Sequence, residues 1–127
     1  MSRAPTRLAI LAIDDDALVR RVLARILRVH DVLEAESGHE ALAILSNGKT
    51  FNAILCDVEM APMRGDELHA LVVERFPEAA KKMIFVTGGT LSPSARAFLE
   101  APDRIVVWKP FHSARIHEAI AEMAARG

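Results

Sequence analysis

Short runs of apolar residues recur along the chain, and most of them lack an alternation of apolar and polar positions. Four runs are rich in isoleucine, valine and leucine, and they cover residues 8–13, 53–56, 83–86 and 105–108. A weaker run at residues 31–34 is polar enough to lie at an edge. Continuous apolar runs of this length are typical of strands that are buried on both faces, as in a parallel sheet. The pattern therefore predicts five parallel strands.

Segments with helical periodicity separate these runs. The first has an apolar stripe formed by Leu18, Val19, Val22, Leu23, Ile26 and Leu27. Further helices are expected after Ser37, before Pro77, from Ser92-Pro93 onward and around residues 116–123, with the two serines as N-caps. Strand and helix thus alternate five times, which predicts a doubly wound α/β fold with helices on both faces of the sheet. No repeat or linker interrupts residues 1–127, so we expect a single domain.

Composition narrows the classes of function. The chain has 127 residues and a formal net charge of -1, so no basic field favours direct binding of nucleic acid. The single cysteine, Cys56, excludes an internal disulfide and fits a reducing compartment, where we expect it to be a buried small hydrophobe. No apolar stretch approaches the roughly 20 residues of a membrane span. We therefore expect a cytoplasmic protein that does not bind membranes.

Polar residues follow the predicted strands at the point where each one ends. Asp14, Asp15 and Asp16 follow the first run, Asp57 follows the third, Thr87 follows the fourth and Lys109 follows the fifth. In an open parallel sheet, ligands bind outside the carboxyl ends of the strands. We therefore expect these side chains to converge at one edge.

The chemistry of this set suits phosphoryl transfer. Clustered carboxylates repel one another unless a cation lies among them, and a hard ion such as Mg²⁺ takes only one or two carboxylates. Asp57 is the candidate nucleophile, Lys109 supplies positive charge and Thr87 supplies a hydroxyl donor. Each residue alone has an ordinary explanation: Asp16 as a helix cap, for example, or Lys109 as a surface lysine. The joint pattern favours a site.

These residues resemble the receiver domain of two-component response regulators over essentially the whole chain. The matching pieces are residues 13–16, residues 55–60, Gly65, residues 85–88 and residues 109–111. The resemblance implies a flavodoxin-like sheet with strand order 2-1-3-4-5. It also implies that Asp57 is the phosphoacceptor and a metal ligand. Asp15 would bind Mg²⁺ directly, Asp14 through water and Glu59 through its backbone carbonyl.

The same resemblance assigns the remaining roles. Thr87 would close on the phosphoryl group, Lys109 would pair with it, and the Lys109–Pro110 peptide bond would be cis. The phosphodonor would be a phosphohistidine on a histidine kinase. We expect no output domain after Gly127 and a signal that passes to a downstream protein or a phosphotransfer domain. A homodimer through the fourth helix, fifth strand and fifth helix stays open.

Two positions depart from the usual receiver pattern. Ala61 stands where the family usually has proline, and Pro62 follows it. Val106 stands where an aromatic residue usually reports phosphorylation, and Trp108 in the same run is expected to pack against the last helix. These departures leave open how phosphorylation is transmitted. Residues 87–93 and 109–111 are also similar to receivers attached to hybrid histidine kinases.

The resemblance implies a switch that catalyses only its own phosphorylation and dephosphorylation, and two other classes of protein compete with it. A haloacid-dehalogenase-type phosphatase needs Asp two residues after the nucleophile, where this chain has Glu59. A degenerate, phosphorylation-independent interaction domain would not need the complete set of key residues. Arginines 20, 21, 25 and 28 form either a solvated face or a kinase-docking face. The five histidines show no i, i+4 pair, so no zinc site is expected.

Overall fold

A computed structural model describes residues 7–89 and 91–126 and contains a five-stranded parallel sheet. The strands are β1 (Ala9–Ile13), β2 (Asp31–Ala35), β3 (Ala53–Asp57), β4 (Met83–Thr87) and β5 (Ile105–Trp108). Their order is β2-β1-β3-β4-β5, which confirms the predicted fold class and topology. Residues 1–6, Thr90 and Gly127 lie outside the described residues. The expectations about Gly127 and about Thr90 within residues 87–93 therefore fall partly outside the described chain.

Six helices connect or follow the strands in the described ranges. They are α1 (Ala17–Ile26), α2 (Gly38–Ser46), α3 (Gly65–Arg75), α4 (Pro77–Ala80), α5 (Pro93–Leu99) and α6 (Ser113–Ala125). Ser37 and Ser92 cap α2 and α5 as predicted, because their hydroxyls accept from Glu40 and Ala95 N–H groups. The single-turn helix α4 was not predicted. Pro77 begins it, which fits the tolerance of a first helical position for a residue without N–H.

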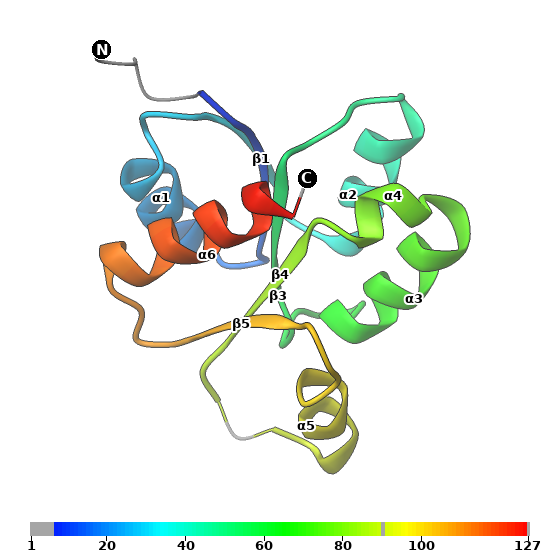
Figure 1. The fold of residues 1–127 in the computed structure, drawn as a ribbon. Coiled ribbons are helices and arrows are strands. Elements are labelled where there is room, and N and C mark those ends of the chain that lie inside the picture. The colour runs from blue at the N-terminus through cyan, green and yellow to red at the C-terminus, as the bar shows by residue number, and fades with distance from the viewer. Residues whose placement is uncertain (1–6, 90, 127) are drawn as a thin grey trace.

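The helices form a layer on each face of the sheet (Figure 1). One core contains Leu23 of α1, the C-cap residue Leu27, Ile116 and Ile120 of α6, and the strand residues that face them. The other core joins buried residues of α2, α3 and α5 to the opposite strand faces, with Phe85 among its largest side chains. Burial on both faces explains why β3 and β4 are continuous apolar runs.

The strand register shows that the carboxyl ends of the central strands lie side by side. Asp57 at the end of β3 lies beside Val86, and Thr87 at the end of β4 lies beside Trp108. Ile13 at the end of β1 lies beside Cys56. The carboxyl ends of these strands therefore coincide, and the residues that follow them share one edge.

The structure limits one expectation about apolar side chains and contradicts another. Leu18 and Val22 belong to the apolar stripe of α1, but they are 65% and 48% exposed, so only part of the stripe is buried. Trp108 is 54% exposed and lies with Val106 and Leu99 in a groove beside α5, not against α6. The cause is strand alternation: Ile105 and Val107 fill the core beneath α1 and α6, so Trp108 turns to the other face.

Candidate functional site

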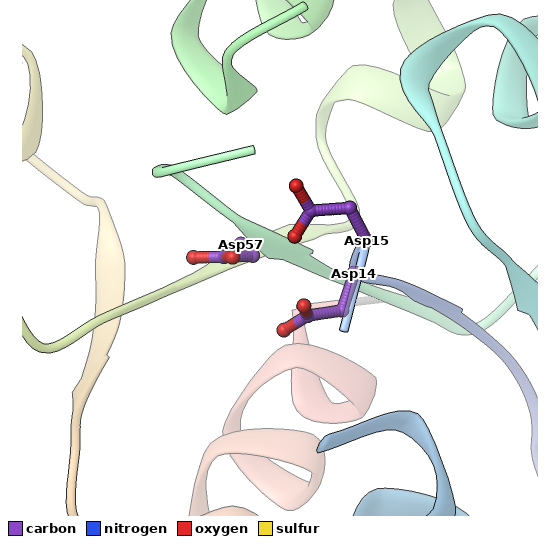
Figure 2. Close-up of side chains that lie close together, drawn as sticks. All are labelled: Asp14, Asp15 and Asp57. Carbon is purple, nitrogen blue, oxygen red and sulfur yellow. The ribbon is translucent and has the colours of Figure 1, made fainter. Parts of the chain in front are cut away.

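Three aspartates meet at the carboxyl edge of the sheet. Asp14 and Asp15 directly follow β1, and Asp57 is the last residue of β3. Each offers a carboxylate oxygen, and these oxygens lie within 4.8 Å of one another. Figure 2 shows the three side chains directed into the same space. Asp14 and Asp57 are buried, whereas Asp15 is exposed.

Lys109 brings the positive charge to this cluster. Its Nζ lies 3.8 Å from Asp57 Oδ1 and 3.9 Å from Asp14 Oδ2. The lysine follows β5, and its backbone N–H donates to the Thr87 carbonyl at 2.7 Å. The Lys109–Pro110 bond is cis, as the sequence resemblance implied. Gly88 allows the approach, because a Cβ there would overlap the Lys109 side chain.

Burial and crowding shift the proton affinities of the two buried carboxyls. Burial raises the pKa of Asp14 to about 6. The hydrogen bond from the Asp16 N–H lowers this pKa, and the negative charge of Asp57 raises it further. Burial also raises the pKa of Asp57, opposed by the Glu59 N–H and by Lys109. One lysine thus faces three carboxylates. Hard oxygen donors in an under-neutralised cluster fit a divalent cation, so Asp14, Asp15 and Asp57 could hold a metal.

The segment after β3 wraps over the acidic cluster. The Ala61 N–H donates to Asp15 Oδ2 at 3.2 Å, and the Ala61–Pro62 bond is cis. Gly65 is needed here, because a Cβ would overlap the backbone of Asp57 and Val58. Its N–H donates to the Val58 carbonyl at 3.0 Å. The displaced proline noted in the sequence therefore lies in a loop that contacts the site directly.

Glu59 makes contacts that sequence reasoning missed. Its backbone N–H donates to Asp57 Oδ1 at 3.1 Å. Its side-chain Oε1 accepts from the Thr87 hydroxyl at 2.9 Å and from the Gly88 and Gly89 N–H groups at 3.0 and 2.8 Å. These bonds lower the pKa of Glu59. The two glycines after Thr87 could have indicated this contact, because their N–H groups are open to the approach of an acceptor.

Arg20 was also missed as part of this region. The residue was assigned to a solvated or docking face, yet its side chain is only 14% exposed. Its Nη1 donates to the Asp14 carbonyl at 2.6 Å, and its Nε donates to Glu34 at 3.2 Å. Arg20 therefore joins α1 to the loop that carries the acidic pair. In the sequence, the contact could be suspected only from the spacing of six residues between Asp14 and Arg20, which places Arg20 on the helix that follows the acidic pair.

Two other residues that the sequence analysis considered, Asp16 and Cys56, have structural roles. Asp16 caps α1 by accepting from the Leu18 N–H at 2.9 Å. Cys56 is fully buried, and burial raises the pKa of its thiol, which agrees with the expectation of a small core residue. His112 stands at the N-cap of α6, but its side chain makes no capping hydrogen bond. None of the helices in residues 7–89 and 91–126 combines the length and apolarity needed to cross a bilayer.

Comparison with known proteins gives the same assignment. The family model of the response regulator receiver domain matches residues 10–121. The transcriptional regulatory protein ZraR of Salmonella typhimurium is 43% identical over 61 residues, which cover 46% of this chain and 14% of that protein. The chain therefore spans a small part of the length of this curated relative.

Solved structures show the same fold. A response regulator receiver protein from Pseudomonas putida matches with a TM-score of 0.79 and 24% identity, over 94% of this chain and 99% of that one. The signal receiver domain of an HD domain-containing protein from Pseudomonas fluorescens Pf-5 matches with a TM-score of 0.81 and 18% identity, over 95% and 97% of the two chains. The family match, the topology and the acidic edge agree, and the chain belongs to the response regulator receiver domain family.

Proposed function

We propose that Asp57 accepts a phosphoryl group from a phosphohistidine of a histidine kinase, in a reaction that requires Mg²⁺. The observation that carries this proposal is the buried Asp57 carboxylate at the open end of the sheet, 3.8 Å from Lys109 and grouped with Asp14 and Asp15. A carboxylate can form an acyl phosphate directly. Phosphoryl transfer asks the protein mainly for positioning and charge neutralisation, which this set of residues supplies.

In this reaction an Asp57 carboxylate oxygen forms a bond to phosphorus while the phosphorus–nitrogen bond of the donor breaks. The electron pair of that bond stays with the imidazole nitrogen of the kinase. Lys109 offsets charge on the transferred group, and Thr87 offers it a hydroxyl donor. The carboxylates of Asp14, Asp15 and Asp57, with the Glu59 backbone carbonyl, would hold Mg²⁺. When bound, Mg²⁺ would supply positive charge that offsets the negative charge of the carboxylates and of the transferred group.

The proposal extends to the location of the chain and to its downstream partners. Residues 1–127 would act as one cytoplasmic receiver domain that modifies only itself. Its phosphorylated form would bind a downstream protein or pass the phosphoryl group to a phosphotransfer domain. Homodimerisation through α5, β5 and α6 would be one form of such output.

The test is incubation with acetyl phosphate and Mg²⁺, followed by intact mass spectrometry. We expect a gain of one phosphoryl group in the wild type and none in Asp57→Asn. Asp16→Asn is the matched control, because it makes the same chemical change at a helix cap and should still be phosphorylated. A lack of adduct with acetyl phosphate and with phosphohistidine donors would contradict the proposal, as would an adduct that persists in Asp57→Asn.

A further inference from the structure

Three hydrogen-bond donors converge on one oxygen of Glu59. They are the Thr87 hydroxyl and the consecutive N–H groups of Gly88 and Gly89, at 2.8 to 3.0 Å from Oε1. Successive backbone N–H groups that point to one side form a concave site for anions. The Glu59 carboxylate is therefore the bound anion of a site built by the end of β4 and the loop after it.

This anion site lies next to the phosphoacceptor. Asp57 and Thr87 end neighbouring strands, and the backbone N–H of Glu59 itself donates to Asp57 Oδ1. A phosphoryl group on Asp57 would carry negative oxygens into the same space. Those oxygens and the Glu59 carboxylate would then compete for the hydroxyl of Thr87 and the N–H of Gly88.

We propose that the Glu59 side chain occupies the phosphoryl-binding donors in the unphosphorylated chain and that phosphorylation of Asp57 displaces it. This inference rests on the proposed function of Asp57. It makes Glu59 a residue that sets how readily the site takes a phosphoryl group. It also means that the loop after β4 is already held by an anion before phosphorylation.

The surroundings of Glu59 are consistent with an exchangeable occupant. Gly89 leaves the room that the carboxylate uses, because a Cβ at this position would overlap Glu59 Oε2. The residue itself is exposed, so its side chain can leave the donors for water without unpacking a core. Its charge stays the same in both positions, and only its three hydrogen bonds change partners.

Phosphorylation of Asp57 and release of Glu59 exchange one set of bonds for another. With acetyl phosphate as donor, an Asp57 oxygen bonds to phosphorus, and the phosphorus–oxygen bond of the donor breaks with its electron pair on the departing acetate. The oxygens of the new phosphoryl group then accept from Thr87 and Gly88, while the Glu59 carboxylate accepts from water. Phosphorylation therefore costs the bonds of the displaced carboxylate, which lowers the apparent affinity of the site.

The first test measures binding of beryllium trifluoride, a phosphoryl mimic, with Mg²⁺ by isothermal titration calorimetry. Glu59→Ala empties the donors and leaves the backbone carbonyl in place. Because the mimic no longer has to displace a charged acceptor from these donors, we expect Glu59→Ala to bind at least tenfold more tightly than the wild type, a change of about 1.4 kcal/mol. Glu118→Ala, which removes an exposed glutamate paired with Arg115 on α6, is the control and should bind like the wild type.

The second test needs neither metal nor phosphodonor. In ¹H–¹⁵N spectra of the free protein, Glu59→Gln should shift the Gly88 and Gly89 amide protons upfield, because a neutral acceptor replaces a carboxylate. This variant keeps the side-chain shape and guards against a loss of folding in Glu59→Ala.

The outcomes separate this inference from the proposed function. Equal affinity of wild type and Glu59→Ala for the mimic, with normal phosphorylation of Asp57, would overturn the inference alone. Unshifted Gly88 and Gly89 amides in Glu59→Gln would also overturn it. Failure of both proteins to take up a phosphoryl group or the mimic would overturn the inference and the proposed function together.

Discussion

Arg20 Nη1 donates a hydrogen bond of 2.6 Å to the backbone carbonyl of Asp14. The bond joins α1 to the loop that carries the acidic pair, and the Glu34 carboxylate holds the guanidinium from the other side. A charged donor on a buried backbone acceptor is worth more than an exposed ion pair. Arg20 is therefore part of the support of the site, although it touches no carboxylate of the metal cluster.

Replacing Arg20 by alanine should lower the free energy of unfolding by about 1–2 kcal/mol, because the Asp14 carbonyl loses a charged donor. Urea denaturation followed by circular dichroism measures the change. Arg21→Ala is the matched control, since Arg21 is exposed on the same helix, and its effect should stay within about 0.5 kcal/mol. Equal effects of the two substitutions would show that Arg20 does not support the loop.

The raised pKa of Asp14 predicts an unusual pH dependence in the absence of divalent cations. The folded chain keeps the Asp14 proton up to about pH 6, whereas the ordinary value is 3.8. The folded state thus binds more protons than the unfolded state between these values, so this group lowers stability as the pH rises through them. At higher pH the penalty is constant.

Asp14→Asn should therefore be more stable than the wild type at about pH 7.5, and the difference should shrink as the pH falls toward about 4. Urea denaturation in chelator at several pH values measures this. Glu36→Gln, which neutralises an exposed carboxylate outside the site, is the control and should not show the gain. A wild type that is more stable than Asp14→Asn at neutral pH would contradict the prediction.

Mg²⁺ should raise the melting temperature of the wild type at neutral pH, because a ligand that binds only the folded state stabilises it by mass action. Asp15→Asn should abolish this response while changing little else. The Asp15 side chain is exposed, and the hydrogen bond that it accepts from the Ala61 N–H can also be accepted by an amide oxygen. Asp31→Asn is the control at a surface ion pair. A full Mg²⁺ response in Asp15→Asn would remove Asp15 from the metal ligands.

Trp108 should contribute little to stability, since more than half of its side chain is exposed. Trp108→Ala should change the free energy of unfolding by less than about 1 kcal/mol. Phe85→Ala, at a residue 1% exposed in the core beneath α3 and α5, should cost about 3–5 kcal/mol. A comparable loss in both variants would mean that Trp108 is packed more closely than its exposure indicates.

Most of the fold could be predicted because it depends on local pattern. Strands β3 and β4 are buried on both faces, and such strands are visible as unbroken apolar runs. Caps at Ser37 and Ser92 depend on residues that are close in sequence. The exposure of Leu18 and Val22 could not be predicted in this way, because periodicity identifies an apolar face but not how much of it a neighbouring element covers.

The pattern of the sequence is sufficient to predict which residues reach the acidic edge. Asp14, Asp57, Thr87 and Lys109 each end or follow a parallel strand, and parallel strands in register place their carboxyl ends together. The positions of the Glu59 carboxylate and the Arg20 guanidinium, by contrast, depend on the folded chain. Both side chains bind backbone groups that are brought to them from other strands and loops. Local periodicity does not encode where those backbone groups and the free space beside them lie.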